Sequence, residues 1–77
     1  MTIKGIIRAI DYLIDDCHDL IAELEGNQED IEERAAERER DLTDREQEKW
    51  DEYEEQIDLL ADAISDLEHH RLALEGN

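Results

Sequence analysis

Two segments of this chain repeat apolar residues at steps of three and four, and this spacing constrains the fold more than any other feature. In the first segment the line runs through Ile3, Ile6, Ile10, Leu13, Cys17, Leu20 and Leu24, widened by Ile7, Ile14 and Ile21. In the second it runs through Tyr53, Ile57, Leu60, Ile64, Leu67 and Leu74. This spacing places apolar side chains on one face of an α-helix. Because the chain contains no proline, both segments are predicted to be amphipathic helices.

The expected helix ends follow from capping residues. Thr2 precedes the first segment, where its hydroxyl is placed to cap a helix. The phrase Leu-Glu-Gly-Asn closes both apolar runs, at Gly26 and Gly76, and glycine is the commonest residue just beyond a helix end. We therefore predict a helix over about residues 3–25, a turn at 26–28 and a long second helix over about 29–75.

The middle of the chain carries a thinner apolar seam. It consists of Ile31, Ala35, Arg38, Leu42, Glu46 and Trp50. The steps from Leu42 to Tyr53 are typical of a stutter in one continuous coiled coil. Thr43 and Glu46 instead fit a capping box, which would start a new helix there. The long helix is therefore either continuous or broken near Thr43.

These elements predict an all-α fold in a single domain, residues 1–77, arranged as an antiparallel hairpin with a long coiled-coil-like second helix. A turn at 26–28 would pair the first helix with the weakly apolar middle and leave the stripe of residues 53–74 uncovered. A second copy of the chain is the natural cover for such a stripe. We expect a homodimer whose interface consists of Ile57, Leu60, Ile64 and Leu67. If the chain breaks near Thr43, a compact three-helix bundle is the alternative.

Charge restricts the partners. The chain has 25 acidic and 8 basic residues, a formal net charge of −17. Direct binding to nucleic acid or to an anionic membrane is excluded, because both rely on basic side chains. Residues 28–58 hold fifteen acids and five bases, net −10, against −4 for residues 1–27 and −3 for residues 59–77. A basic protein surface is the expected partner, although adaptation to high salt would produce a similar composition.

Neither a membrane span nor a secretion signal is predicted. No stretch approaches the roughly 20 apolar residues that cross a bilayer, and no charged leader precedes a long apolar run. The expected compartment is the cytoplasm. Cys17, the single cysteine, lies on the apolar stripe and is expected to be a reduced, buried thiol.

Catalytic and metal sites are not expected. Asp15 with His18, and Asp66 with His69, have the spacing of carboxylate–histidine pairs in di-metal helical bundles, but they point away from the predicted core. Pairs of acids spaced for Mg²⁺ also occur, as at Glu29-x-x-Glu32, and arise by chance in so acidic a chain. There is no Ser-His-Asp arrangement and no glycine-rich phosphate loop. We expect no enzyme, no metal and no cofactor.

The predicted partner-binding surface is the acidic middle of the chain. Its acids are Glu29, Glu32, Glu33, Glu48, Asp51, Glu52 and Glu55. Trp50 and Tyr53 lie one helical turn apart among them and could anchor a basic partner. The alternative is that both rings simply pack within the fold.

In size, acidity and helicity the whole chain resembles the small acidic inhibitors of bacteriophages and mobile elements, including anti-CRISPR proteins and nucleic-acid mimics. No diagnostic motif accompanies the resemblance. It implies a non-catalytic inhibitor, acting in the host cytoplasm, whose acidic helix surface occupies a basic nucleic-acid-binding site of a host defence or DNA/RNA-handling protein. The alternative function is a structural coiled-coil module for dimerisation or for docking another helix.

Overall fold

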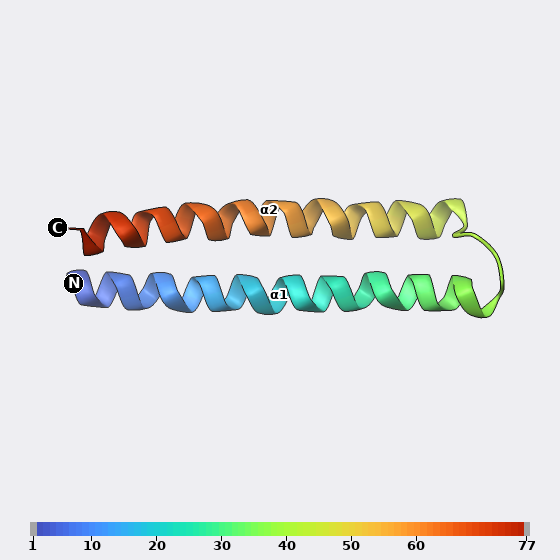
Figure 1. Cartoon of the computed structure of the whole chain (residues 1–77), viewed down its shortest axis with the longest axis horizontal. Coiled ribbons are helices and arrows are strands. Elements are labelled where there is room, and N and C mark those ends of the chain that lie inside the picture. Colours follow the sequence, from blue (N-terminus) through green and yellow to red (C-terminus); the bar gives the residue numbers. More distant parts are fainter. Residues whose placement is uncertain (1, 77) are drawn as a thin grey trace.

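The computed structural model describes residues 2–76 and forms a hairpin of two antiparallel helices (Figure 1). Helix α1 covers Ile3–Glu37 and helix α2 covers Asp44–Glu75. The hairpin is a rod of 56 × 16 × 14 Å with both chain ends at one end and the turn at the other. The predicted all-α hairpin with a long second helix is confirmed. Two helices over residues 2–76 rule out the three-helix alternative.

Helix α1 begins where the sequence predicts. Thr2 has an extended backbone conformation, and its Oγ1 accepts a hydrogen bond from the Gly5 N–H at 3.0 Å. This bond satisfies one of the backbone donors left free at a helix start. The predicted cap is confirmed.

The predicted end of the first helix at 25 and the turn at 26–28 are wrong, because α1 continues through Gly26 to Glu37. A glycine inside a helix costs only about 1 kcal/mol relative to alanine. Turning at residues 38–43 instead pairs the two strongly apolar segments with each other along the rod. Burial of these apolar faces outweighs the local preference of one glycine.

Helix α1 ends in a Schellman motif that uses glutamate where glycine is usual. Glu39 has a φ of 54°, in the left-handed region. The Glu39 N–H bonds the Ala36 carbonyl at 3.1 Å, and the Arg40 N–H bonds the Ala35 carbonyl at 3.2 Å. These bonds satisfy carbonyl groups at the helix end. The left-handed conformation costs a non-glycine residue about 1–2 kcal/mol in steric strain.

Helix α2 begins in the capping box that the sequence offered as one alternative. The Glu46 N–H donates to Thr43 Oγ1 at 3.2 Å, and the Thr43 N–H donates to Glu46 Oε1 at 3.0 Å. Arg38 also pairs with Glu46, which links the end of α1 to the start of α2. The break near Thr43 is confirmed, and the continuous helix with a stutter is wrong. The backbone hydrogen bond from Thr43 lowers the pKa of Glu46, and Arg38 acts in the same direction against the effect of desolvation.

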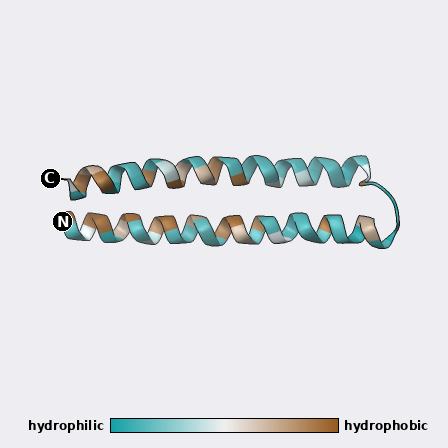
Figure 2. Cartoon of the chain, viewed as in Figure 1, coloured by the Kyte–Doolittle hydropathy of each residue, from teal (hydrophilic) through white to brown (hydrophobic). Residues whose placement is uncertain are grey.

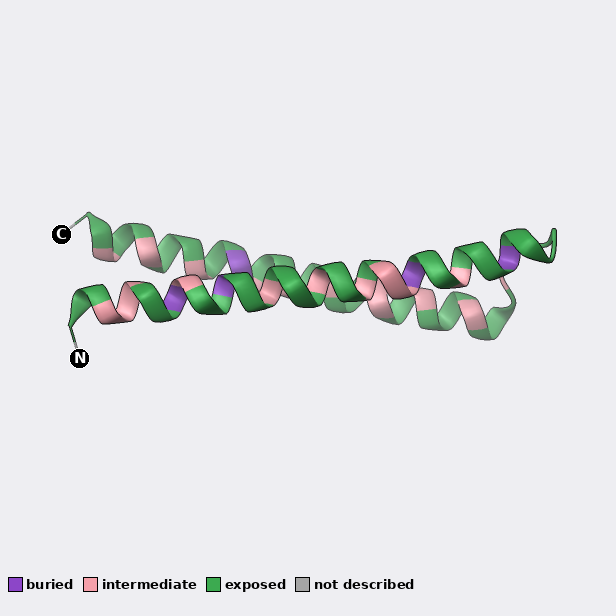
Figure 3. Ribbon diagram, turned by 90° about the horizontal axis from the view of Figure 1, so that it is seen from below, coloured by how far each residue is buried: buried purple, intermediate pink, exposed green. Residues whose placement is uncertain are grey.

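A heptad pattern explains which side chains lie between the helices. Its inward positions, a and d, on α1 are Ile7, Ile10, Ile14, Cys17, Ile21, Leu24, Gln28, Ile31 and Ala35. On α2 they are Glu46, Trp50, Tyr53, Ile57, Leu60, Ile64, Leu67, Arg71 and Leu74. Each of these residues is buried or half-buried, and Figure 3 shows buried and half-buried positions recurring along both helices. This regular step of three and four is the pattern of a coiled coil.

The core line predicted on α1 needs one correction. Leu13 and Leu20 are 51% and 47% exposed, whereas Ile14 is buried and Ile21 is half-buried. The line through Leu13 and Leu20 would continue at heptad steps into Asn27 and Arg34, which are polar. The line through Ile14 and Ile21 continues inward along the whole helix, so it buries more apolar surface.

The predicted dimer interface required the apolar stripe of α2 to be uncovered. In the structure α1 of the same chain covers this stripe. Ile64 forms the core cluster with Ile10 and Ile14, and Leu67 packs against it. Ile57 and Leu60 are half-buried in the same seam. All four predicted interface residues therefore face α1 of the same chain, because the turn lies at 38–43 rather than at 26–28.

The rod has two dissimilar halves. We call residues 28–58 the turn half and residues 3–27 with 59–75 the terminal half. Figure 2 shows apolar residues concentrated in the terminal half. The exposed large apolar side chains all lie there: Ile3, Tyr12, Leu13, Leu20, Leu59 and Leu72. The turn half carries the net charge of −10.

Candidate protein-binding surfaces

A buried polar contact holds the two helices together in the turn half. Gln28 is 7% exposed, and its Nε2 donates to the Trp50 carbonyl at 3.2 Å and to Glu54 Oε2 at 3.0 Å. The Trp50 indole Nε1 in turn donates to Glu32 Oε1 at 3.0 Å. Two carboxylates, one from each helix, are thereby held at fixed positions on the surface.

Glu32 and Glu54 lie on the same side of the hairpin. Both follow an inward a position by four residues, which makes them e positions, and the e positions of an antiparallel pair share one flank. Further acids occupy this flank at e positions or at the adjacent b positions. We call the six of these acids that lie within residues 25–32 and 51–58 the acidic flank; they are Glu25, Glu29, Glu32, Asp51, Glu54 and Asp58. Asp44 lies on the same side at the start of α2, as do Asp11, Asp15, Glu68 and Glu75 nearer the chain ends.

The acidic flank forms two rows of negative charge. Within each row the acids are three or four residues apart, which places them about 4.5–6 Å apart along the helix axis. The two helix axes of a packed pair lie about 8–10 Å apart. The flank therefore presents a short double row of carboxylates.

The hairpin divides the seven acids predicted to bind a partner. Glu29, Glu32 and Asp51 lie on the acidic flank. The f positions opposite the seam hold Glu33, Glu48 and Glu55, and Glu52 lies toward the opposite flank. Glu25, Glu54 and Asp58 lie on the acidic flank but are not among the predicted residues; their heptad positions assign them to the flank once the position of the turn is known.

The two aromatic residues predicted as anchors belong to the seam between the helices. Trp50 is half-buried at an a position and supports Glu32 through its indole N–H. Tyr53 is half-buried at a d position, and the Lys49 ammonium lies 5.8 Å from its ring centroid. The packing alternative therefore describes both rings.

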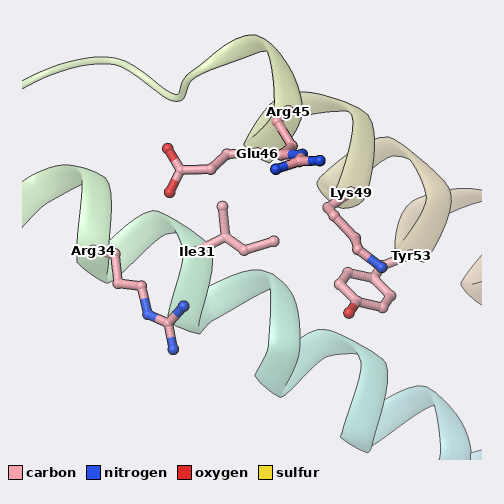
Figure 4. Close-up of a pocket in the computed structure, with 6 residues that line it drawn as sticks. All are labelled: Ile31, Arg34, Arg45, Glu46, Lys49 and Tyr53. Atoms are coloured by element: carbon pink, nitrogen blue, oxygen red, sulfur yellow. The ribbon is translucent and has the colours of Figure 1, made fainter.

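The opposite flank of the turn half carries a basic pocket of about 460 Å³ (Figure 4). It is lined by Ile31, Arg34, Arg45, Glu46, Lys49 and Tyr53. None of the pocket's three cations, Arg34, Arg45 and Lys49, forms an ion pair with another residue in the described range 2–76. This cluster was not predicted from the sequence: Arg34 and Lys49 both occupy g positions, but these positions share a flank only because the chain turns at residues 38–43. The turn half thus has an acidic flank and a mixed, partly basic one.

A second polar contact lies in the terminal half. Arg71 occupies an inward position, and its Nη1 contacts Asp11 Oδ1 at 2.8 Å, while its Nε lies 3.9 Å from Glu75 Oε1. The hydrogen bond and the charge of Asp11 raise the pKa of Arg71. A charged residue in an otherwise apolar stripe favours the one register in which its partner is opposite.

Neither helix within residues 2–76 has an apolar stretch sufficient to span a bilayer. In the same part of the chain, histidine, cysteine and acidic side chains form no group of three or more that could hold a metal ion. Comparison with protein-family models, curated proteins and solved structures gives no match.

Proposed function

We propose that this protein is a non-catalytic inhibitor whose acidic flank occupies a basic, nucleic-acid-binding surface of a host defence or DNA/RNA-handling protein. The observation that carries the proposal is the double row of carboxylates on residues 25–32 and 51–58. Long-range attraction between such a surface and a basic groove accelerates association, and arginine and lysine side chains of the partner then bind the carboxylates.

The charge density of the acidic flank supports nucleic-acid mimicry. Each strand of a DNA duplex carries one negative charge per about 3.4 Å along the axis. Each row of the acidic flank carries one per about 5 Å. The flank is thus somewhat less dense in charge than a duplex and, like a duplex, presents two rows of negative charge.

The fixed positions of Glu32 and Glu54 also support the proposal. A surface carboxylate normally loses side-chain freedom when it binds a partner, which reduces affinity. Here Trp50 and Gln28 already hold these two carboxylates in the free protein. Such preorganisation is expected of a surface that binds through charge.

The proposal is tested by capture of bacterial lysate proteins on the immobilised hairpin, with a duplex DNA oligonucleotide as competitor. Basic nucleic-acid-binding proteins should be retained at low salt, released by the oligonucleotide, and released as salt rises from about 50 to 500 mM. Retention that neither DNA nor salt affects would contradict the proposal.

A matched pair of variants separates the acidic flank from net charge alone. The triple variant Glu25→Lys, Glu29→Lys and Asp58→Lys reverses three acids of the flank. The control, Glu33→Lys, Glu48→Lys and Glu55→Lys, changes the net charge equally on the outer faces of the helices. The first should weaken capture at least tenfold more than the second; equal losses would show that only total charge matters.

A second candidate function is a structural module that associates through helix faces, as a homodimer. It is favoured by the position of the exposed large apolar side chains, all of which lie in the terminal half. Sedimentation equilibrium over a range of protein concentrations tests it. A monomer at all concentrations would exclude this candidate and leave the inhibitor proposal intact.

A further inference from the structure

We infer that two copies of this hairpin pack antiparallel through one flank of their terminal halves and form a four-helix segment with the two turn halves at opposite ends. The inference rests on the second candidate function, self-association, and specifies its face and geometry. It is independent of what the acidic flank binds.

The contact face is the flank that carries the basic pocket further along the rod. Three residues of this face lie two heptads from residues that line the pocket: Leu20 from Arg34, Leu59 from Arg45, and Ala63 from Lys49. Residues two heptads apart share a helix face in a coiled coil, so these three lie on the pocket's flank.

Leu13, one heptad before Leu20, belongs to the same flank, and Ile6, half-buried where it packs against the core cluster, extends the flank toward the chain ends. We call Ile6, Leu13, Leu20, Leu59 and Ala63 the apolar flank. Leu13, Leu20 and Leu59 are 51%, 47% and 64% exposed, although each is large enough to contribute substantially when buried. Asp16 and Asp66 lie at its outer edge, where they remain in contact with water.

The exposed area of the single hairpin supports a second copy as the occupant. The chain exposes 6088 Å², whereas a globular monomer of 9.1 kDa exposes about 4,900 Å². The excess of about 1,200 Å² comes from the elongated shape of the rod, and an interface that buries roughly 800 Å² per partner would bring the exposed area per chain close to the globular value. A two-helix rod with so small a core gains stability when a second rod covers one flank.

Charge selects the antiparallel arrangement. The two segments of the terminal half carry −4 and −3, while the turn half carries −10. A parallel dimer would place two turn halves side by side, within or near the Debye length of about 8 Å, and would set Arg34 and Lys49 against their own copies. Overlap of the terminal halves alone places the two −10 segments at opposite ends.

A distance between labelled sites distinguishes the arrangements. The apolar flank is centred near residue 16, and Glu33 lies about 26 Å further along α1. Spin labels at Glu33→Cys, in a Cys17→Ala background, should therefore be about 55 Å apart in the antiparallel dimer and less than about 30 Å apart in a parallel one. Double electron–electron resonance measures this distance.

Sedimentation equilibrium of matched variants tests the contact face. The double variant Leu13→Gln and Leu59→Gln should raise the dimer dissociation constant at least about a hundredfold. The control Tyr12→Gln and Leu72→Gln removes equally exposed apolar side chains from other faces and should change it less than about threefold. All four side chains lie outside the buried core, so circular dichroism should show both variants to be helical.

The outcomes separate this inference from the proposed functions. A dimer that tightens with added salt, loses affinity in the first variant only and gives the long distance supports the inference. The short distance, larger oligomers, or equal effects of the two variants would overturn the arrangement while leaving self-association standing. A monomer under all conditions would overturn both and would not affect the inhibitor proposal, whose complex must weaken with salt.

Discussion

The terminal and turn halves of the rod share one heptad pattern but have different side chains at its inward positions. In the terminal half the inward positions are mainly isoleucine and leucine, and the core cluster of Ile10, Ile14 and Ile64 lies there. In the turn half the inward positions include Gln28, Glu46 and Trp50, and a polar contact replaces much of the apolar one. The two halves therefore differ in what fills the seam between the helices: mainly apolar side chains in the terminal half, and polar and aromatic side chains beside apolar ones in the turn half. A single coiled-coil pattern accommodates both in one short chain.

Truncation of one inward isoleucine in each half should test this comparison with the largest change in the free energy of unfolding. Ile14→Ala, in the core cluster, should lower the free energy of unfolding by about 3 kcal/mol, because it leaves a cavity and removes buried apolar surface. Ile31→Ala, half-buried in the turn half, should cost about 1 kcal/mol, since its site is open to solvent. Urea unfolding at one protein concentration measures both. Equal losses would show that stability is spread evenly along the rod.

The next test concerns Gln28, the buried polar residue of the turn half. Gln28→Ala should cost about 1–2 kcal/mol, because the Glu54 carboxylate and the Trp50 carbonyl lose a donor. Gln28→Leu should retain most of the stability by adding apolar contact, yet should release Glu54 from its fixed position. If this leucine variant binds a basic partner more weakly than the wild type does, the polar contact serves to hold the Glu54 carboxylate in position for binding. Unchanged affinity would confine Gln28 to a structural role.

A gain of stability is expected at the end of α1. Glu39→Gly should stabilise the hairpin by about 1 kcal/mol, because glycine adopts the left-handed conformation at position 39 without a steric penalty. Thermal unfolding followed by circular dichroism measures the change. Glu39→Ala, which removes the charge but keeps the Cβ, is the control and should give little gain. Stabilisation by alanine as large as by glycine would attribute the effect to charge.

The smallest expected effect is a pH dependence at the start of α2. Hydrogen bonds from Thr43 and Arg38 lower the pKa of Glu46 below its ordinary value of 4.5. The stability that the Glu46 carboxylate contributes is therefore present above about pH 4.5 and is lost as the pH falls through the lowered value.

The measurement is the difference in unfolding free energy between the wild type and Glu46→Ala at several pH values, since the other carboxylates titrate in both proteins and largely cancel. This difference should be constant near neutral pH and should shrink below about pH 4.5. Glu46→Gln keeps a capping side chain without the charge and should show no such decline relative to Glu46→Ala. A difference that does not vary down to pH 3 would contradict the assignment.

Local chemistry determined the helix starts in this protein. The N-caps at Thr2 and Thr43 were readable, because each depends on residues within four positions along the chain. The end of α1 could not be predicted from local sequence. The helix continues through Gly26, where an end was predicted, and it ends before Glu39, where none was predicted. Glycine at position 26 is tolerated within α1, where a Cβ would have nothing within 4 Å, whereas the true end uses a glutamate in a conformation that favours glycine. In both cases long-range packing overrode the local preference.

The candidate surfaces were predicted in composition but not in arrangement. The excess of acids between residues 28 and 58 was evident, yet which of them share a flank depends on where the chain turns. Of the seven acids predicted to bind a partner, Glu29, Glu32 and Asp51 share one flank of the hairpin, whereas Glu33, Glu48 and Glu55 face elsewhere. The basic pocket could not be predicted, because Arg34 and Lys49 are brought together only when α2 folds back along α1.

The sequence by itself determined that this protein is helical, acidic and amphipathic, since helix periodicity, capping and charge are properties of neighbouring residues. Only the tertiary structure decided that the turn lies at residues 38–43, that Ile14 and Ile21 rather than Leu13 and Leu20 face inward, and that the stripe at Ile57, Leu60, Ile64 and Leu67 is covered by α1 of its own chain. The physical reason is that burial is a property of pairs of segments. The apolar segments near the two chain ends lie at similar distances from residue 40, so a turn there buries both at once, and a turn at Gly26 would bury neither well.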